Sequence, residues 1–475
     1  MSYLQSAYIF IAKPFGAINT EKNRKVRDVL VFLCFFAIFV LILVFISRPA
    51  MFKDEAGELS SLETALLGLN QFQNAIICGT ILLIATLLSV ENGIKKVPWN
   101  WFIGYIWLFL SVLIVISGLF HNIGSGSIVS QVIIALILPM LFLAWHSRDD
   151  SERLYVLVSY AIIALVFIVG FMSILAYPLA DNTIANNSTR YMSFLNNPNR
   201  LGFFATTGAV AAVYLCGYMK KFWIIIPAAA LGICLQFAWL CKARSSALAI
   251  LLLLVLWMLL HLKNKDSVKK LLAFILIAAV VCGATAPFIT REAPEKAAYN
   301  SVPIPLVAVA KAAEGDALER LQSGDDTGDY TSGRIAAWKE YVKYINITGN
   351  DASYYLPIKA IDEESGFSVY YSLAHNTPLE VAFRSGIPAG ILFLLLELIA
   401  LWYVIVRLLG RRKNLNRADL FACPAMLAFI IISTVESLVE SLNGIFTTNV
   451  SVMFFLACGV LFTFGMKKEE SDTEV

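Results

Sequence analysis

The sequence predicts an all-α polytopic membrane protein with about 12 transmembrane helices, and three observations lead to this fold class. Hydrophobic residues make up 59% of the 475 residues, charged residues make up 15%, and the mean hydropathy is +0.72. Apolar runs of the roughly 20 residues that a helix needs to cross a bilayer recur along the chain. A polar segment of about 95 residues, 290–385, interrupts them and is far longer than an ordinary connection.

The predicted helices follow the apolar runs in chain order. Before the polar segment they are expected near Val29–Ile46, Asn74–Val90, Trp101–Phe120, Ile128–Trp145, Leu154–Tyr177, Gly202–Tyr218, Phe222–Leu240, Ser246–Leu262 and Leu271–Ile289. After it they are expected near Gly386–Leu408, Leu420–Ser437 and Ile445–Phe464. Within the polar segment, short helices are expected at Pro305–Leu321 and Ser332–Tyr344.

The orientation follows from the positions of Lys and Arg, which accumulate in the cytoplasmic loops of membrane proteins. The first apolar run is too long for a cleaved signal peptide, so the basic N-terminus is expected to stay in the cytoplasm. The loops that then face inward are basic, for example 263–270 and 407–417. The expected division is a cytoplasmic N-terminus at 1–28, transmembrane helices 1–9 at 29–289, a large extracytoplasmic loop at 290–385, transmembrane helices 10–12 at 386–466 and a cytoplasmic tail at 467–475.

Metal, redox and nucleic-acid functions are not indicated. Six of the eight cysteines lie inside apolar runs, where a thiol behaves as a small hydrophobe, and no cysteine pair has the spacing of metal ligands. The formal charge of +3 does not suggest a nucleic-acid partner. We therefore expect neither a metal nor a cofactor.

The outer loops carry cations against the usual bias, namely Arg190, Arg200, Lys242 and Arg244. For Arg190, snorkelling to lipid headgroups is an equally good interpretation. Arg244 lies in the very short turn 240–246, where a cation facing lipid would be costly. An anion bound nearby would explain the two cations of this turn.

The polar segment contains two further candidates for a site. Arg334, Trp338 and Tyr341 share one face of the expected helix and could meet a sugar and its phosphate, or dock an amphipathic helix on the membrane surface. His375 precedes the next apolar run, and a histidine can accept a proton near neutral pH, although a lone histidine is more often structural. Asn376 could hold the histidine ring in place.

Together these features resemble the O-antigen ligase and polymerase superfamily of membrane enzymes. The matching segments are Asn197-Pro198-Asn199-Arg200-Leu201-Gly202, Ala243-Arg244-Ser245-Ser246-Ala247-Leu248-Ala249, Gly333-Arg334 with Trp338, and His375-Asn376 with Gly386 and Gly390. Gly386 and Gly390 also form a small-xxx-small pair, which favours tight helix packing. In relatives the turn often reads serine-arginine-glycine, whereas this chain has Ala243-Arg244-Ser245.

The resemblance implies a GT-C-like helical core and an inverting glycosyltransferase without a metal or other cofactor. Such an enzyme moves a glycan from a polyprenyl diphosphate, such as undecaprenyl diphosphate, to a glycan or glycolipid acceptor at the outer face of the cytoplasmic membrane, in cell-surface polysaccharide biosynthesis. The resemblance assigns His375 as the general base. It assigns the donor's diphosphate to Arg200, Arg244 and Arg334. The candidate supporting residues are Lys242, Trp338, Asn376 and Glu436. Glu436, at the outer end of the eleventh predicted helix, could orient His375 or an acceptor, or it could lie in solvent.

Three questions stay open at this point. The sequence does not separate a ligase from a polymerase, which differ in their acceptor. A flippase or other transporter of lipid-linked oligosaccharides is an alternative, although the cations gather on the outer side instead of lining a path. A GT-C enzyme that uses a polyprenyl-monophosphate sugar is another, with its base among Asp54, Glu55 and Glu58.

Overall fold

The computed structural model describes ten long helices and several short elements. The described residues are 10, 13–14, 20–46, 71–90, 101–121, 125–146, 153–176, 190–193, 195, 197–219, 221–261, 265–290, 334–350, 358–361, 368–371 and 374–410. The long helices are α2 (Arg24–Ile46), α4 (Gln71–Ser89), α5 (Trp101–Phe120), α6 (Ser125–His146), α7 (Arg153–Ala176), α9 (Pro198–Tyr218), α10 (Ile225–Leu240), α11 (Arg244–His261), α12 (Lys265–Ile289) and α17 (Ile387–Gly410). The short elements are the 3-10 helices η1 (Glu21–Asn23) and η2 (Lys221–Ile224), the helices α15 (Arg334–Tyr344) and α16 (Thr377–Ser385), and the strands β1 (Ile358–Ile361) and β2 (Ser368–Tyr371).

The protein is a multi-pass membrane protein, as predicted. Within the described part of the chain, six helical segments are long and apolar enough to cross a membrane, and α5, α6, α11 and α17 contain shorter apolar stretches of 10–17 residues. The first ten predicted runs each coincide with one of the long helices to within several residues. The runs Leu420–Ser437 and Ile445–Phe464, the cytoplasmic tail and the helix Pro305–Leu321 lie outside the described residues, so the count of twelve and the location of the termini remain predictions.

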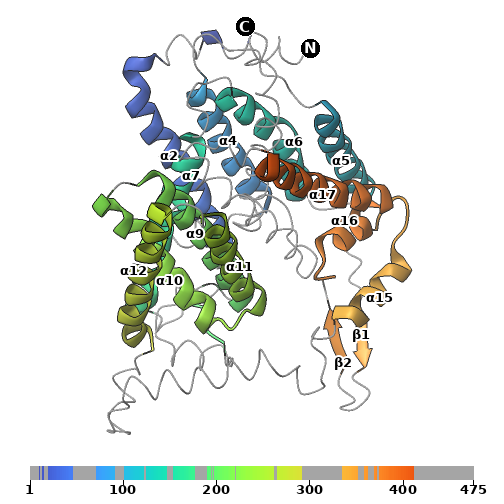
Figure 1. Ribbon diagram of the computed structural model, residues 1–475. Coiled ribbons are helices and arrows are strands. Elements are labelled where there is room, and N and C mark those ends of the chain that lie inside the picture. The colour runs from blue at the N-terminus through green and yellow to red at the C-terminus, as the bar shows by residue number, and fades with distance from the viewer. Residues whose placement is uncertain are drawn as a thin grey trace, which may run out of the picture.

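The predicted all-α class is confirmed for the long helices, and the polar segment adds a hairpin that we did not predict. Strands β1 and β2 pair antiparallel, with Ile358 opposite Tyr371 and Ile361 opposite Ser368. The hairpin and α15 lie together on one side of the molecule (Figure 1).

The long helices pack in a series that places the site elements in two groups. Successive neighbours in this series are α12, α10, α9, α7, α2, α4, α6, α5 and α17, and α11 packs on α9. The first group, α9 to α12, lies on the opposite side of the molecule from α5, α16 and α17 (Figure 1).

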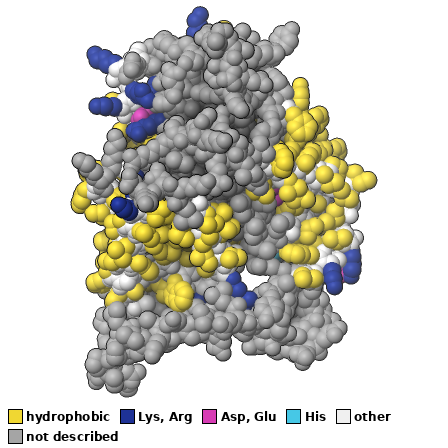
Figure 2. All heavy atoms as spheres, viewed as in Figure 1, with side chains coloured by type: hydrophobic (Ala, Val, Ile, Leu, Met, Phe, Trp, Pro, Cys, Tyr) yellow, Lys and Arg dark blue, Asp and Glu magenta, His cyan; other side chains and the backbone are white. Residues whose placement is uncertain are grey.

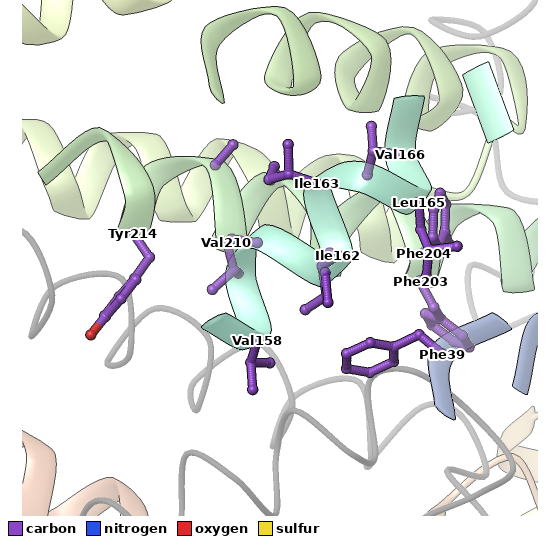
Figure 3. Packing of buried hydrophobic residues seen from close by; sticks show 14 of the residues in the cluster. Phe39, Val158, Ile162, Ile163, Leu165, Val166, Phe203, Phe204, Val210 and Tyr214 are labelled. Carbon is purple, nitrogen blue, oxygen red and sulfur yellow. The ribbon is translucent and has the colours of Figure 1, made fainter. Parts of the chain in front are cut away.

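The core centres on α7 and α9. Every residue of α9 from Leu201 to Cys216 is buried, so this helix is enclosed by its neighbours. Figure 3 shows Ile162 and Val166 of α7 beside α9, with Phe39 of α2 close to Phe203. Many α9 residues are Gly, Ala or Thr, and small side chains let helices approach closely inside a membrane. The firmly packed α9 can therefore hold its first turn, with Arg200, in a fixed position.

Candidate functional site

The first turns of α9 and α11 lie side by side, and each carries an arginine of the predicted site. Asn197 caps α9, since its side-chain oxygen accepts a hydrogen bond from the Asn199 amide at 2.8 Å. A Cβ atom at Gly202 would lie 2.5 Å from Ser246 Oγ and 2.8 Å from Ala243 Cβ. Only the absence of a side chain at this position allows the two helices to start so close together.

Arg190 fastens this pair of helix starts instead of snorkelling to lipid. Its Nε donates to the Cys241 carbonyl oxygen at 2.9 Å, and its Nη2 donates to Asn199 Oδ1 at 2.6 Å. The Tyr191 amide also donates to the Leu240 carbonyl oxygen at 3.2 Å. The loop before α9 is thus bonded both to α9 and to the turn that leads into α11.

The arginine pair consists of Arg200, which is exposed, and Arg244, which is half-buried. Lys242 precedes Arg244 in the turn and has a φ of 50°, which places its backbone in the left-handed region. Helix N-termini present backbone N–H groups and the positive end of the helix dipole. Two such termini with two guanidinium groups favour an anion with several oxygen atoms, such as a diphosphate.

His375 belongs to a second group of site residues, at the start of α16. It lies between Ala374 and Asn376, and hydrogen bonds fix the positions of both neighbours. The Ala374 amide donates to Glu380 Oε2 at 2.9 Å, and the Ala374 carbonyl oxygen accepts from Trp338 Nε1 at 2.8 Å. On the other side, Asn376 Oδ1 accepts from the Leu379 amide at 2.9 Å and so caps α16. His375 itself is half-buried and has a φ of 48°, a conformation that is uncommon for a residue other than glycine. The flanking bonds hold the histidine in this strained conformation.

Glu380 is the centre of the hydrogen-bond network around His375. Glu380 is 1% exposed to solvent. Its Oε1 accepts a hydrogen bond from Arg384 Nε at 2.5 Å, and its Oε2 accepts one from the Ala374 amide. A buried carboxylate is tolerated when it is paired and hydrogen-bonded. Glu380 therefore ties the segment before α16 to the last turn of that helix.

Trp338 and Tyr341 of α15 pack on this segment. Tyr341 is 2% exposed, and its ring lies against Phe383 with centroids 5.0 Å apart. Burial, and next the charge of Glu380, raise the pKa of Tyr341, so the phenol stays protonated. Of the two interpretations left open for this helix face, a sugar contact or docking, Tyr341 agrees with packing, and Trp338 donates its indole N–H to the Ala374 carbonyl oxygen. Asn376, expected to hold the histidine ring, has its side-chain oxygen engaged in the helix cap.

The corner between α16 and α17 depends on two glycines and the turn 346–350. Gly386 ends α16 with a φ of 90°, and a Cβ there would collide with the Ile347 carbonyl oxygen. The Ile387 amide donates to the Asn346 carbonyl oxygen at 2.9 Å. Gly390 faces α16, where a Cβ would lie 2.5 Å from Ala382 Cβ. Gly390 of the small-xxx-small pair therefore lets α17 pack tightly against a neighbouring helix, as expected, and that neighbour is the short helix α16.

Contacts from α5 and from the turn 346–350 complete the corner. Ser117 Oγ of α5 lies 2.8 Å from the Arg384 carbonyl oxygen and 3.0 Å from that of Thr348, both within donating distance. The Asn350 amide and its side-chain Nδ2 donate to the Phe383 carbonyl oxygen at 3.0 and 2.9 Å. The histidine segment is therefore anchored to a membrane helix through α16.

The structure brings the predicted residues together in two groups. Arg200, Lys242 and Arg244 lie at the starts of α9 and α11, whereas Trp338, His375 and Asn376 lie at the α15–α16 corner. Arg334 is the first residue of α15, but its side chain lies outside the described part of the structure. All of Glu436 lies outside it as well. Figure 2 shows a hollow between the two hydrophobic parts of the surface, with Lys or Arg side chains beside it.

Sequence reasoning missed the supporting roles of Glu380, Arg384 and Ser117. Glu380 and Arg384 are four residues apart, the spacing of an ion pair on one helix face, so their pairing could have been predicted. The bond from Glu380 to Ala374 and the contact from Ser117 depend on tertiary structure. Among the residues described here, no group of three or more His, Cys, Asp or Glu side chains could hold a metal ion.

Comparison with known families agrees with the resemblance. Residues 240–394 match the family model described as O-Antigen ligase. The match begins at the turn before Arg244, runs through α15 and α16 and ends within α17. The comparison with curated proteins finds no match. The predicted resemblance to the O-antigen ligase and polymerase superfamily is thus confirmed over this part of the chain.

Proposed function

We propose that this protein is a membrane glycosyltransferase of the O-antigen ligase and polymerase type. It would transfer a glycan from a polyprenyl-diphosphate carrier to a glycan or glycolipid acceptor, at the outer face of the cytoplasmic membrane. One observation carries the proposal: the stretch that matches the O-antigen ligase family includes both Arg244 and the fixed His375. The neighbouring start of α9 adds Arg200 to the same end of α11.

The proposed role of the arginines is to bind the donor's diphosphate and to stabilise it as a leaving group. Arg200 and Arg244 come from adjacent helix starts, and Arg334 would join them from α15. A planar guanidinium matches two phosphate oxygens at once, and such charge-assisted bonds strengthen as charge develops on the leaving oxygen. With that charge stabilised by arginines, the reaction would proceed without a metal.

The proposed role of His375 is that of general base. Its imidazole would take the proton from the acceptor hydroxyl as the hydroxyl oxygen bonds to the anomeric carbon and the bond from that carbon to the diphosphate breaks. Attack from the face opposite the diphosphate inverts the anomeric centre. The half-buried position of His375 leaves the side chain accessible to an acceptor.

The proposal is tested with the full-length protein in liposomes that contain a synthetic polyprenyl-diphosphate oligosaccharide and a glycolipid acceptor, with and without a chelator. We expect product from the wild type and none from His375→Ala, and the product length will distinguish a polymerase from a ligase. Loss of product on chelation would contradict metal independence. Movement of the carrier across the bilayer without any product would replace this proposal by transport.

Arg244→Lys is expected to lower kcat/KM for the donor by about tenfold to a hundredfold, because lysine keeps the charge but cannot bind two phosphate oxygens. The measurement is the initial rate over a range of donor concentrations. Arg153→Lys is the matched control, since Arg153 bonds to Asp28 at 2.9 Å, away from the site, and it should have nearly wild-type kinetics. Equal activity of the two variants would rule out the diphosphate role of Arg244.

Gly202→Ala is expected to lower the thermal unfolding temperature, because its Cβ has no room between α9 and Ser246. The starts of α9 and α11 must then move apart, so transfer activity should fall as well. Gly283→Ala is the control, since a Cβ at Gly283 would meet nothing within 4 Å and alanine is the better helix former. An unchanged unfolding temperature of Gly202→Ala would show that the close approach of the two helices is not required.

A further inference from the structure

The helix α15 exposes an apolar edge that is bordered by lysines. Ile335 and Val342 are 46% and 57% exposed, and their spacing of seven residues is close to two helical turns, so they share one edge. Lys339 and Lys343 come next around the helix, and both are exposed. This arrangement differs from a solvated helix face, in which large apolar side chains are not lined up beside the cations.

The apolar edge continues onto the ends of two apolar helices of the membrane bundle. Ile347, which follows α15, is 74% exposed, and its carbonyl oxygen lies against Gly386, the residue before α17. The next residue, Thr348, contacts Ser117 Oγ near the end of α5 at 3.0 Å. Ile347 therefore lies where α5 ends and α17 begins.

Both of those helix ends expose large apolar side chains. On α5 they are Leu119 and Phe120, and on α17 they are Ile387 and Ile391. Figure 2 shows the corresponding hydrophobic surface on the right of the view, with a group of Lys or Arg side chains directly below it, over the position of α15 in Figure 1. The apolar edge of α15 thus extends a surface that faces lipid, and its lysines lie at the boundary of that surface.

We propose that α15 lies in the membrane interface and docks on the phosphate headgroups of the leaflet at this end of the protein. Ile335 and Val342 enter the border of the acyl layer, while Lys339 and Lys343 extend to the phosphates. Lys343 is already bonded to Glu340 at 2.5 Å, so Lys339 is the stronger headgroup ligand. An anionic headgroup is favoured because both border residues are cations.

This docking has a consequence for His375. The inner face of α15 carries Trp338, which holds the Ala374 carbonyl oxygen, so the helix contacts lipid on one side and the histidine segment on the other. Docking therefore fixes the height of His375 relative to the bilayer. The lipid contact itself does not depend on the proposed function.

The test places a nitroxide spin label on full-length protein in lipid nanodiscs, through Ile335→Cys, Val342→Cys or Tyr344→Cys. Position 344 is nine residues from 335, about half a turn away around the helix. We expect the labels at 335 and 342 to relax more with oxygen than with a water-soluble nickel complex, and the label at 344 to show the reverse. The unsubstituted protein, treated with the same reagent, gives the background from native cysteines. Equal access of nickel to all three labels would overturn the proposal.

A second comparison tests the headgroup contact. Nanodiscs of phosphatidylcholine alone are compared with nanodiscs that also contain phosphatidylglycerol, using the label at 342 with and without Lys339→Gln. One lysine near an anionic surface is expected to raise the ratio of docked to undocked helix about fivefold. The anionic lipid should therefore increase the accessibility of the label to oxygen relative to nickel, and Lys339→Gln should remove this increase. No shift in either protein would overturn the headgroup contact. Low access of both reagents, with broadening between labels, would show that a second copy of the chain covers this edge instead.

Discussion

Glu380→Ala is expected to reduce kcat for glycan transfer by about a hundredfold or more, while the KM for the donor stays close to that of the wild type. Glu380 touches no substrate in the proposed mechanism, and we regard it as a positioning residue. Its carboxylate accepts the bond from the Ala374 amide that fixes the residue before His375. Without this bond, the left-handed backbone of His375 loses a support and the imidazole leaves the acceptor. The measurement is the initial rate as a function of donor concentration at several pH values, and the loss of kcat should persist at each of them.

Glu380→Gln is the conservative control for this prediction. The glutamine keeps an oxygen that can accept from Ala374 but removes the charge that binds Arg384. It should restore most of the activity that Glu380→Ala loses, if the backbone bond matters more than the charge. An equally inactive Glu380→Gln would assign the effect to the Arg384 ion pair.

A double variant separates positioning from general loss of structure. If Glu380 acts through His375, then Glu380→Ala should cost nothing further in a His375→Ala protein, because interacting residues are not additive. Hydrogen exchange of the Ala374 amide gives a readout that does not need activity, and it should become faster in Glu380→Ala. An additive loss in the double variant would exclude the positioning role.

Length and hydropathy were sufficient to predict the membrane part of this fold. A membrane helix must satisfy its own backbone hydrogen bonds and present apolar side chains over about 20 residues, so each of the first ten predicted runs marks a helix. The location of Arg200 and Arg244 at one end of the bundle was also within reach, because each lies in the first turn of a helix that was predicted to start on the outer side. Gly202 is the residue that allows the two helix starts to lie so close together, and only the structure shows this contact.

The corner that carries His375 could not be predicted in the same way. Its residues are polar or small, and their positions depend on contacts between segments far apart in the sequence, such as Ser117 with Arg384 and Trp338 with Ala374. Tyr341 shows the same limitation, since helical spacing correctly placed it on one face with Trp338 but could not tell whether that face meets a ligand or α16. Amphipathic spacing defines a face and leaves its partner undetermined.

Gly386→Ala is expected to destabilise the α16–α17 corner by about 3 kcal/mol or more. The backbone at Gly386 has φ 90° and ψ 158°, a region that an alanine avoids, and the new Cβ would meet the Ile347 carbonyl oxygen. The backbone strain and the steric collision add to one another, because relieving the collision moves the turn 346–350 away from α16. Thermal unfolding and the yield of monodisperse protein in detergent are the measurements.

Ile347→Ala is the matched control, since the exposed side chain of Ile347 is removed while its carbonyl oxygen stays in place. It should unfold at nearly the wild-type temperature. In Gly386→Ala, hydrogen exchange of the Ile387 amide should become faster, because that amide donates to the Asn346 carbonyl oxygen across the same corner. Wild-type exchange at Ile387 together with wild-type stability would contradict the account, because it would mean that the corner accommodates a side chain at 386 without moving the turn.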